Sequence, residues 1–219
     1  MQTYKIIFNL NSPVAFIDRP TLDGILAYAY VKENTGNKNL GQKLNITKDE
    51  LIDLSGMPIA QHKDGYFIAS SMFYDESKAV ESTERWRKRW ANKHDKLAYF
   101  GKQKRKVRVN AGAFKSYDMP LRVVHIDQVW FYFQSDNIDQ VKKLLDKHIY
   151  FIGKKRSQGY GEIRNYLITI SNFDFKGIYR PIPARFIDFQ NFEGKITIRE
   201  NSWKPPYWLP DHIEPCAVP

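Results

Sequence analysis

Four stretches rich in β-branched and aromatic residues predict strands over residues 3–10, 65–74, 121–134 and 162–170. The alternation of apolar and polar positions is clearest in the first, which predicts a buried strand at the start of the chain. The third is the longest and predicts a single strand. Polar, glycine-punctuated residues at 34–45 predict a loop between the first and second stretches.

Two further stretches have the helical period. In the first, Pro20 stands near the helix start, Asp18 or Thr21 is the expected N-cap, and Asp23 in the first turn complements the helix dipole. Its apolar face comprises Leu22, Ile25, Leu26, Ala29 and Tyr30. In the second, Asp136 is the expected cap and the apolar face comprises Ile138, Val141, Leu144 and Leu145.

The order of these elements predicts an α+β fold. Without an insertion at 75–120, the chain reads β-α-β-β-α-β, the ferredoxin-like (RRM-like) arrangement. We therefore expect one such domain over residues 1–171, interrupted by the basic insertion. The remainder, 172–219, is rich in proline and aromatic residues and is expected to wrap the domain surface as a tail.

Composition narrows the class of partner. The 219 residues are 42% hydrophobic, enough for a real core, and carry a net charge of +10 with a pI of about 9.5. Such a charge favours a polyanion, either nucleic acid or an anionic membrane. No apolar run approaches the roughly 20 residues of a membrane span, and the N-terminus has no signal pattern. With one cysteine, Cys216, we expect a reducing, cytoplasmic setting.

The insertion concentrates the positive charge. Residues 82–97 predict a basic helix and 103–109 a cationic strand, and the segment 81–108 carries eleven Lys/Arg against three Asp/Glu, a local +8. Such side chains neutralise phosphates. The candidate RNA contacts here are Arg85, Arg87, Lys88, Arg89, Lys102, Lys104, Arg105, Lys106 and Arg108. Trp86 and Trp90 either stack on unpaired bases or dock the helix.

The end of the insertion offers a second set of candidates. Residues 104–120 predict a hairpin that projects from the sheet, with Phe114, Lys115, Tyr117 and Met119 as possible wedges and cations for nucleic acid. In the alternative interpretation, Phe114 and Met119 belong to the core.

A glycine-rich basic loop at 151–163 lies between the second helix and the last strand. Gly153, Gly159 and Gly161 bracket three cations, Lys154, Lys155 and Arg156. Glycine permits positive φ and close backbone approach, so such a loop can surround an anion. It is not a nucleotide-binding P-loop, which runs from strand to helix and ends in Gly-Lys-Ser/Thr. An ordinary tight turn before an edge strand is the alternative.

Catalytic residues are harder to find. Metal-independent RNA cleavage needs a general base, but the histidines (His62, His94, His125, His148 and His212) are scattered without paired spacing. Asp18 and Asp23 fit capping better than metal binding. We expect no metal, no cofactor and an inert Cys216.

Three features together resemble the RAMP superfamily of CRISPR-associated RNA-binding subunits: the glycine-rich loop, the strand–helix junction at 12–29, and the thumb-like place of the basic insertion. The stretches Gly112–Leu121 and Pro205–Trp208 look like the Cas-five-type subunit of type IV complexes.

This resemblance implies a non-catalytic subunit that clamps the five-prime handle of the guide RNA and caps the backbone filament. The implied loop contacts are Lys154, Lys155, Arg156, Ser157, Gln158, Gly159 and Tyr160. The implied partners are guide RNA, a Cas-seven-like backbone subunit, the large subunit and target DNA near the start of the guide. Cas-six relatives cleave the repeat, commonly with a histidine near the first helix, where this chain has Phe16, Asp18 and Arg19. A metal-independent repeat endoribonuclease is the alternative, and a stand-alone RNA-binding protein a third.

Overall fold

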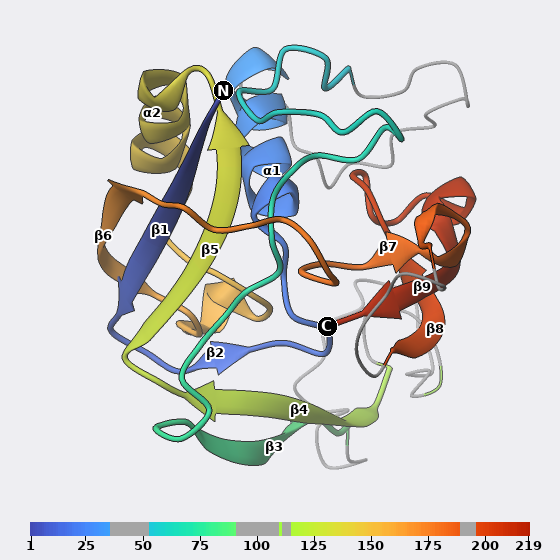
Figure 1. Cartoon of the computed structure of the whole chain (residues 1–219). Coiled ribbons are helices and arrows are strands. Elements are labelled where there is room, and N and C mark those ends of the chain that lie inside the picture. Colours follow the sequence, from blue (N-terminus) through green and yellow to red (C-terminus); the bar gives the residue numbers. More distant parts are fainter. Residues whose placement is uncertain (36–52, 91–109, 111–114, 189–195) are drawn as a thin grey trace.

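The computed structural model describes residues 1–35, 53–90, 110, 115–188 and 196–219. Within these ranges the chain is α+β, with two α-helices and mostly antiparallel sheets (Figure 1). The central sheet has β1 (Gln2–Leu10) between β5 (Gln128–Ser135) and β6 (Ile163–Ile170), both antiparallel to it. The strands predicted at 3–10 and 162–170 are thereby confirmed.

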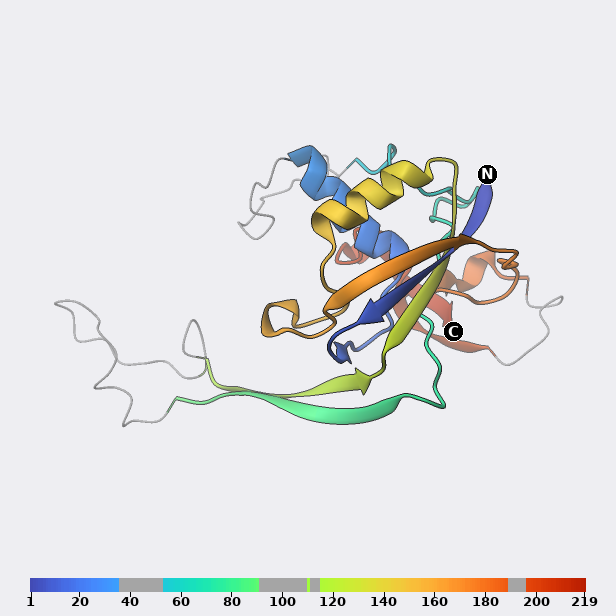
Figure 2. The ribbon, with the colours of Figure 1, turned by 90° about the vertical axis from the view of Figure 1, so that its left-hand side faces the viewer.

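Both helices cover the same face of the central sheet (Figure 2). In α1 (Leu22–Thr35), Leu22 and Leu26 are fully buried, and α2 (Ile138–His148) buries Val141, Leu144 and Leu145. These residues join the core aromatic side chains of β1 and β5. The apolar faces predicted for both helices are confirmed. The predicted cap of α2 is wrong: Asn137, not Asp136, accepts the hydrogen bond, from the Gln140 backbone N–H at 3.1 Å.

The predicted strand at 65–74 is present only as isolated bridges, two of which join it to β5, at Ala69–Phe133 and Phe73–Trp130. The segment divides its backbone hydrogen bonds among several neighbours. Ser70 N–H donates to the carbonyl of Tyr132 in β5, but the next two N–H groups donate to the carbonyls of Tyr179 and Pro20. Because no single neighbouring strand accepts the backbone hydrogen bonds of this segment, a regular strand does not form.

The prediction of a single strand over residues 121–134 is wrong. The chain breaks at 126–127 into β4 (Tyr117–His125) and β5, which belong to different sheets. β4 lies between β2 (Val14–Ala15) and β3 (Val80–Lys88). β5 alone continues into the central sheet.

The helix predicted at 82–97 is also wrong over the residues that the structure describes, because residues 80–88 are strand β3. All nine residues of β3 are paired antiparallel with β4, so long-range pairing overrides the local helical pattern. The β3–β4 hairpin extends away from the body of the protein (Figure 2). Only part of the predicted insertion is therefore tested. The cationic strand at 103–109 lies outside the described residues. The same holds for residues 111–113 of the turn that the sequence predicts at 110–113, and for the start of a short helix that the capping pattern at 47–50 predicts.

The C-terminal region is more than a surface tail. It forms a sheet in the order β7 (Ile182–Pro183), β9 (Ile213–Val218), β8 (Thr197–Ser202). The sheet has its own core, in which Tyr179, Trp203 and Cys216 are buried. Short, largely polar strands such as β8 carry little hydrophobic pattern, so the sequence does not predict them.

A buried ion pair joins this sheet to the start of α1. Arg180 and Asp23 are both fully buried, with their nearest nitrogen and oxygen 3.0 Å apart. The hydroxyl of Tyr207 donates to the other oxygen of Asp23 at 2.8 Å, and its own oxygen accepts from Arg180 at 2.9 Å. Asp23 keeps the first-turn position that the sequence predicts, and it is also part of this buried network. It anchors the C-terminal sheet, because a buried charge requires a partner.

Candidate nucleic-acid interface

The backbone of the glycine-rich loop depends on two of its glycines. Gly153 and Gly161 have φ values of +84° and +69°, and a Cβ at Gly161 would lie 1.9 Å from the carbonyl oxygen of Ile152. The loop is fastened to the segment before α1: the Lys154 N–H donates to Ala15 O and the Gly161 N–H to Pro13 O, each at 2.7 Å. The loop therefore presents its cations from a fixed backbone.

The three consecutive cations of the loop point to three different surroundings. The ammonium of Lys155 lies 4.0 Å from the centroid of the Trp86 ring on β3. The guanidinium of Arg156 lies 4.8 Å from the ring centroid of Tyr28 on α1. Lys154 lines a groove on the side of the C-terminal sheet. Because aromatic faces attract cations without neutralising them, Lys155 and Arg156 are oriented while keeping their charge.

The loop also contacts the hairpin through polar groups. The Tyr160 hydroxyl donates to a carboxylate oxygen of Glu84, and this hydrogen bond raises the pKa of Tyr160. Further out, the indole N–H of Trp86 donates to the Tyr117 hydroxyl at 2.6 Å. Met119 lies opposite Trp86 and is 47% exposed, so it is not a core residue. We call the strand face that carries Glu84, Trp86, Lys88, Tyr117 and Met119 the inner face of the hairpin.

Alternation along β3 places a different set of cations on the opposite side, which we call the outer face. There Arg85, Arg87 and Arg89 approach Asp118 of β4 at 3.1, 3.2 and 3.7 Å. Partial burial acts to raise the pKa of Asp118, but hydrogen bonds and charges from Arg85 and Arg87 outweigh it and hold the pKa below its ordinary value. Asp118 therefore stays ionised and offsets part of the charge of this face.

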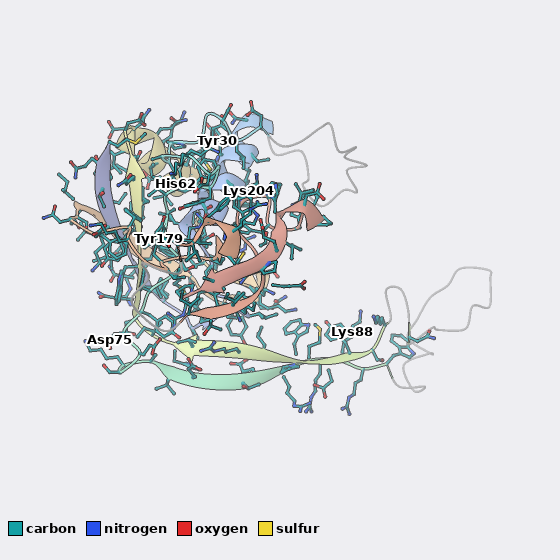
Figure 3. The ribbon with its side chains drawn as sticks, turned by 45° about the vertical axis from the view of Figure 1, so that its right-hand side comes forward. Tyr30, His62, Asp75, Lys88, Tyr179 and Lys204 are labelled. Carbon is teal, nitrogen blue, oxygen red and sulfur yellow. The ribbon has the colours of Figure 1, made fainter. Side chains whose placement is uncertain are left out.

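The structure thus brings the loop candidates Lys155 and Tyr160 beside the inner face of the hairpin, whereas Arg85, Arg87 and Arg89 lie on the outer face. Figure 3 shows Lys88 toward the far end of the hairpin, away from the body. Lys115 is exposed just before β4. The candidates Lys102, Lys104, Arg105, Lys106, Arg108 and Phe114 lie outside the described residues.

Two aromatic or cationic residues near the loop were not among the sequence candidates. Tyr28 lies off the apolar face predicted for the first helix, and Arg122 lies in a strand of mostly apolar residues, so neither carries a local signal. Beside the loop, Tyr28 helps to line a hollow of about 600 Å³ that also contains Lys32, Tyr150 and Arg156. A surface of this kind suits phosphates and stacked bases.

The described histidines have separate structural partners. His148 lies 2.8 Å from a Glu33 oxygen, and Lys147 approaches the same carboxylate at 2.6 Å. Hydrogen bonds, first from Lys147 and then from His148, lower the pKa of Glu33 to about 2. His125 contacts Ser82, and His62 contacts Asp64.

Metal ligands and a reactive thiol are not apparent among the described residues. No group of three or more His, Cys, Asp or Glu side chains there could hold a metal ion. Burial raises the pKa of the Cys216 thiol to about 11, which disfavours the reactive thiolate.

A fixed, basic, glycine-rich loop joined to an aromatic and cationic hairpin in an α+β fold defines a candidate nucleic-acid-binding protein. Residues 71–219 match the family model described as CRISPR type IV associated protein Csf3. The chain belongs to the Csf3 family, which confirms its resemblance to the Cas-five-type subunit of type IV complexes. No curated protein matches the chain. In the described residues, no helix is both long and apolar enough to cross a membrane.

Proposed function

We propose that this chain is the non-catalytic RNA-binding subunit of a type IV CRISPR effector complex. It binds the five-prime, repeat-derived handle of the guide RNA between the glycine-rich loop and the inner face of the β3–β4 hairpin. It also caps the filament of Cas-seven-like backbone subunits and contacts the large subunit and the target DNA near the start of the guide. The complex acts in the cytoplasm.

One observation carries this proposal: the loop and the hairpin meet through Lys155 on Trp86 and Tyr160 on Glu84. The glycine-rich loop and the basic insertion are the two sequence features that most strongly favour RNA binding. They are far apart along the chain, yet they contact each other in the structure. Phosphates would contact the loop cations, and unpaired bases would stack on the aromatic side chains. Membership of the Csf3 family supports a CRISPR complex as the setting.

The finer description of the fold belongs to the same proposal. With the bridged segment 67–73 counted as the remaining strand, the sheet order β6-β1-β5-(67–73) and the two helices on one face fit a ferredoxin-like domain over residues 1–171. The β3–β4 hairpin then takes the place of the thumb. Residues 172–219 form a C-terminal part that packs on this domain.

Charge reversal in the loop tests RNA binding. The triple variant Lys154→Glu, Lys155→Glu, Arg156→Glu should lose its guide RNA when it is purified from cells that express the whole complex. The matched control reverses three exposed lysines on other segments, Lys63, Lys142 and Lys176. It should retain the RNA, because net charge alone does not hold a handle in one place. RNA content that is equal in the two variants would refute the loop assignment.

A cleavage assay tests the non-catalytic assignment. Purified protein incubated with labelled repeat RNA in EDTA should leave the RNA intact. Efficient cleavage at one position would instead establish the endoribonuclease alternative. Size-exclusion of the co-expressed complex separates the subunit role from a stand-alone protein, since the subunit should migrate with RNA and partners.

A further inference from the structure

A second basic site lies next to the glycine-rich loop and away from the inner face of the hairpin. It is a groove of about 620 Å³ between the segment before α1 and the C-terminal sheet. Its walls include residues 17–21, Arg122 of β4, Lys154 of the loop, and residues of β8. Volumes of about 300–1,000 Å³ are typical of sites for small ligands or single groups of a larger one.

The charge of the groove favours a phosphate. Its described lining contains four basic side chains, Arg19, Arg122, Lys154 and Arg199, and one carboxylate, Asp18. Three of these side chains have a carboxylate partner: Arg199 contacts Asp18 at 2.8 Å, and Arg19 and Arg122 contact Glu76 and Glu81, which do not line the groove. The side chains of Arg199 and Arg122 are nevertheless 52% and 44% exposed. A guanidinium has several N–H donors, so one carboxylate partner leaves others for a phosphate.

The uncharged lining favours a base or sugar beside that phosphate. Thr21, Ser71 and Asn201 supply hydroxyl and amide groups. The hydroxyl oxygen of Ser202, also in the wall, is buried and has no hydrogen-bond partner among the described residues. A buried polar group without a partner is unfavourable, and a bound ligand that supplies one removes the cost.

We infer that this groove holds one nucleotide of the single-stranded RNA that the glycine-rich loop binds, with its phosphate toward Arg199 and Arg122. The inference rests on the proposed function. Lys154 provides the continuity: its backbone N–H is fixed on Ala15, and its side chain lines the groove. Lys154 directly precedes Lys155 in the loop, so an RNA strand bound to Lys155 and Arg156 can continue past Lys154 into the groove. Unstacked bases of single strands are the form in which proteins usually read RNA sequence.

The salt dependence of RNA affinity tests this inference. For single-stranded RNA, each neutralised phosphate contributes about 0.7 to the slope of log K against log salt. Arg199→Gln in the full chain should lower the slope for single-stranded repeat RNA by about 0.7. The control, Arg185→Gln, removes a similarly exposed arginine that is also paired with a carboxylate, Glu214 at 2.9 Å, but does not line the groove. It should leave the slope unchanged.

A hydroxyl-radical footprint on the same RNA locates the contact. Arg199→Gln should expose one or two nucleotides that the unmodified chain protects, and the rest of the footprint should persist. If Arg199→Gln fails to fold, Asn201→Ala serves in its place. An unchanged slope and footprint in a folded groove variant would overturn the groove assignment while the loop assignment stands. Absence of RNA binding by the unmodified chain would instead overturn the proposed function, and with it this inference.

Discussion

The loop and the outer face of the hairpin each present three basic side chains, but the protein holds them in different ways. On the loop, Lys155 and Arg156 lie over aromatic rings, and glycines fix the backbone that carries them. On the outer face, Arg85, Arg87 and Arg89 gather around Asp118, which offsets part of their charge. Equal numbers of cations in a sequence therefore do not mean equal attraction for phosphate. We expect the loop and the inner face to dominate RNA binding.

The largest effect should come from the backbone of the loop. Gly161→Ala combines a positive φ with a clash at Ile152, and should lower the free energy of unfolding by about 3–5 kcal/mol. Gly159 also has a positive φ, +86°, but a Cβ there would meet open space. Gly159→Ala should cost only about 1–2 kcal/mol.

Chemical denaturation of the two glycine variants measures this difference. RNA affinity should fall in the same order. Similar unfolding midpoints for both variants would show that close packing of the loop on Ile152 does not fix its shape.

An intermediate effect should follow from the inner face. Trp86→Ala removes the ring under Lys155 and the stacking surface, and should weaken binding of single-stranded RNA by about 1–3 kcal/mol. Trp130 is a matched control, because Lys5 lies over its ring at 4.9 Å on the central sheet. Trp130→Ala should leave RNA affinity unchanged. An equal loss in both variants would mean that Trp86 acts through stability and not through RNA.

The smallest effect should appear on the outer face. Asp118→Asn frees the three arginines from their shared carboxylate, so RNA affinity at low salt should rise a few-fold, with the gain disappearing as salt is added. Titration at two salt concentrations checks this. Weaker RNA binding at both would indicate that Asp118 positions the arginines and that the outer face, too, is a primary contact surface.

The sequence predicts those features whose signal is local. The helical periods of α1 and α2 and the alternation in β1 predict which side chains face the core. Three glycines around three cations predict the basic loop. The hairpin is different. Arginines at 85, 87 and 89 share a strand face, but in a helix Arg87 would lie nearly opposite Arg85 and Arg89, and only pairing with β4 decides between the two.

Other features depend on contacts that no local pattern records. From the sequence, Asp23 is expected to cap a helix. Its ion pair with Arg180, which lies far along the chain, appears only in the tertiary structure. The groove draws Arg122 and Arg199 from separate sheets, so their proximity is a property of the tertiary structure.

Photo-crosslinking tests the central claim most directly. Photoreactive residues placed singly at positions 86, 155 and 87 would report which RNA nucleotides lie near the inner face, the loop and the outer face. If loop and inner face form one clamp, positions 86 and 155 should crosslink to the same or adjacent nucleotides of the guide-RNA handle, with much less product from position 87. Crosslinks from 86 and 155 to distant nucleotides, or the strongest product from 87, would contradict the account.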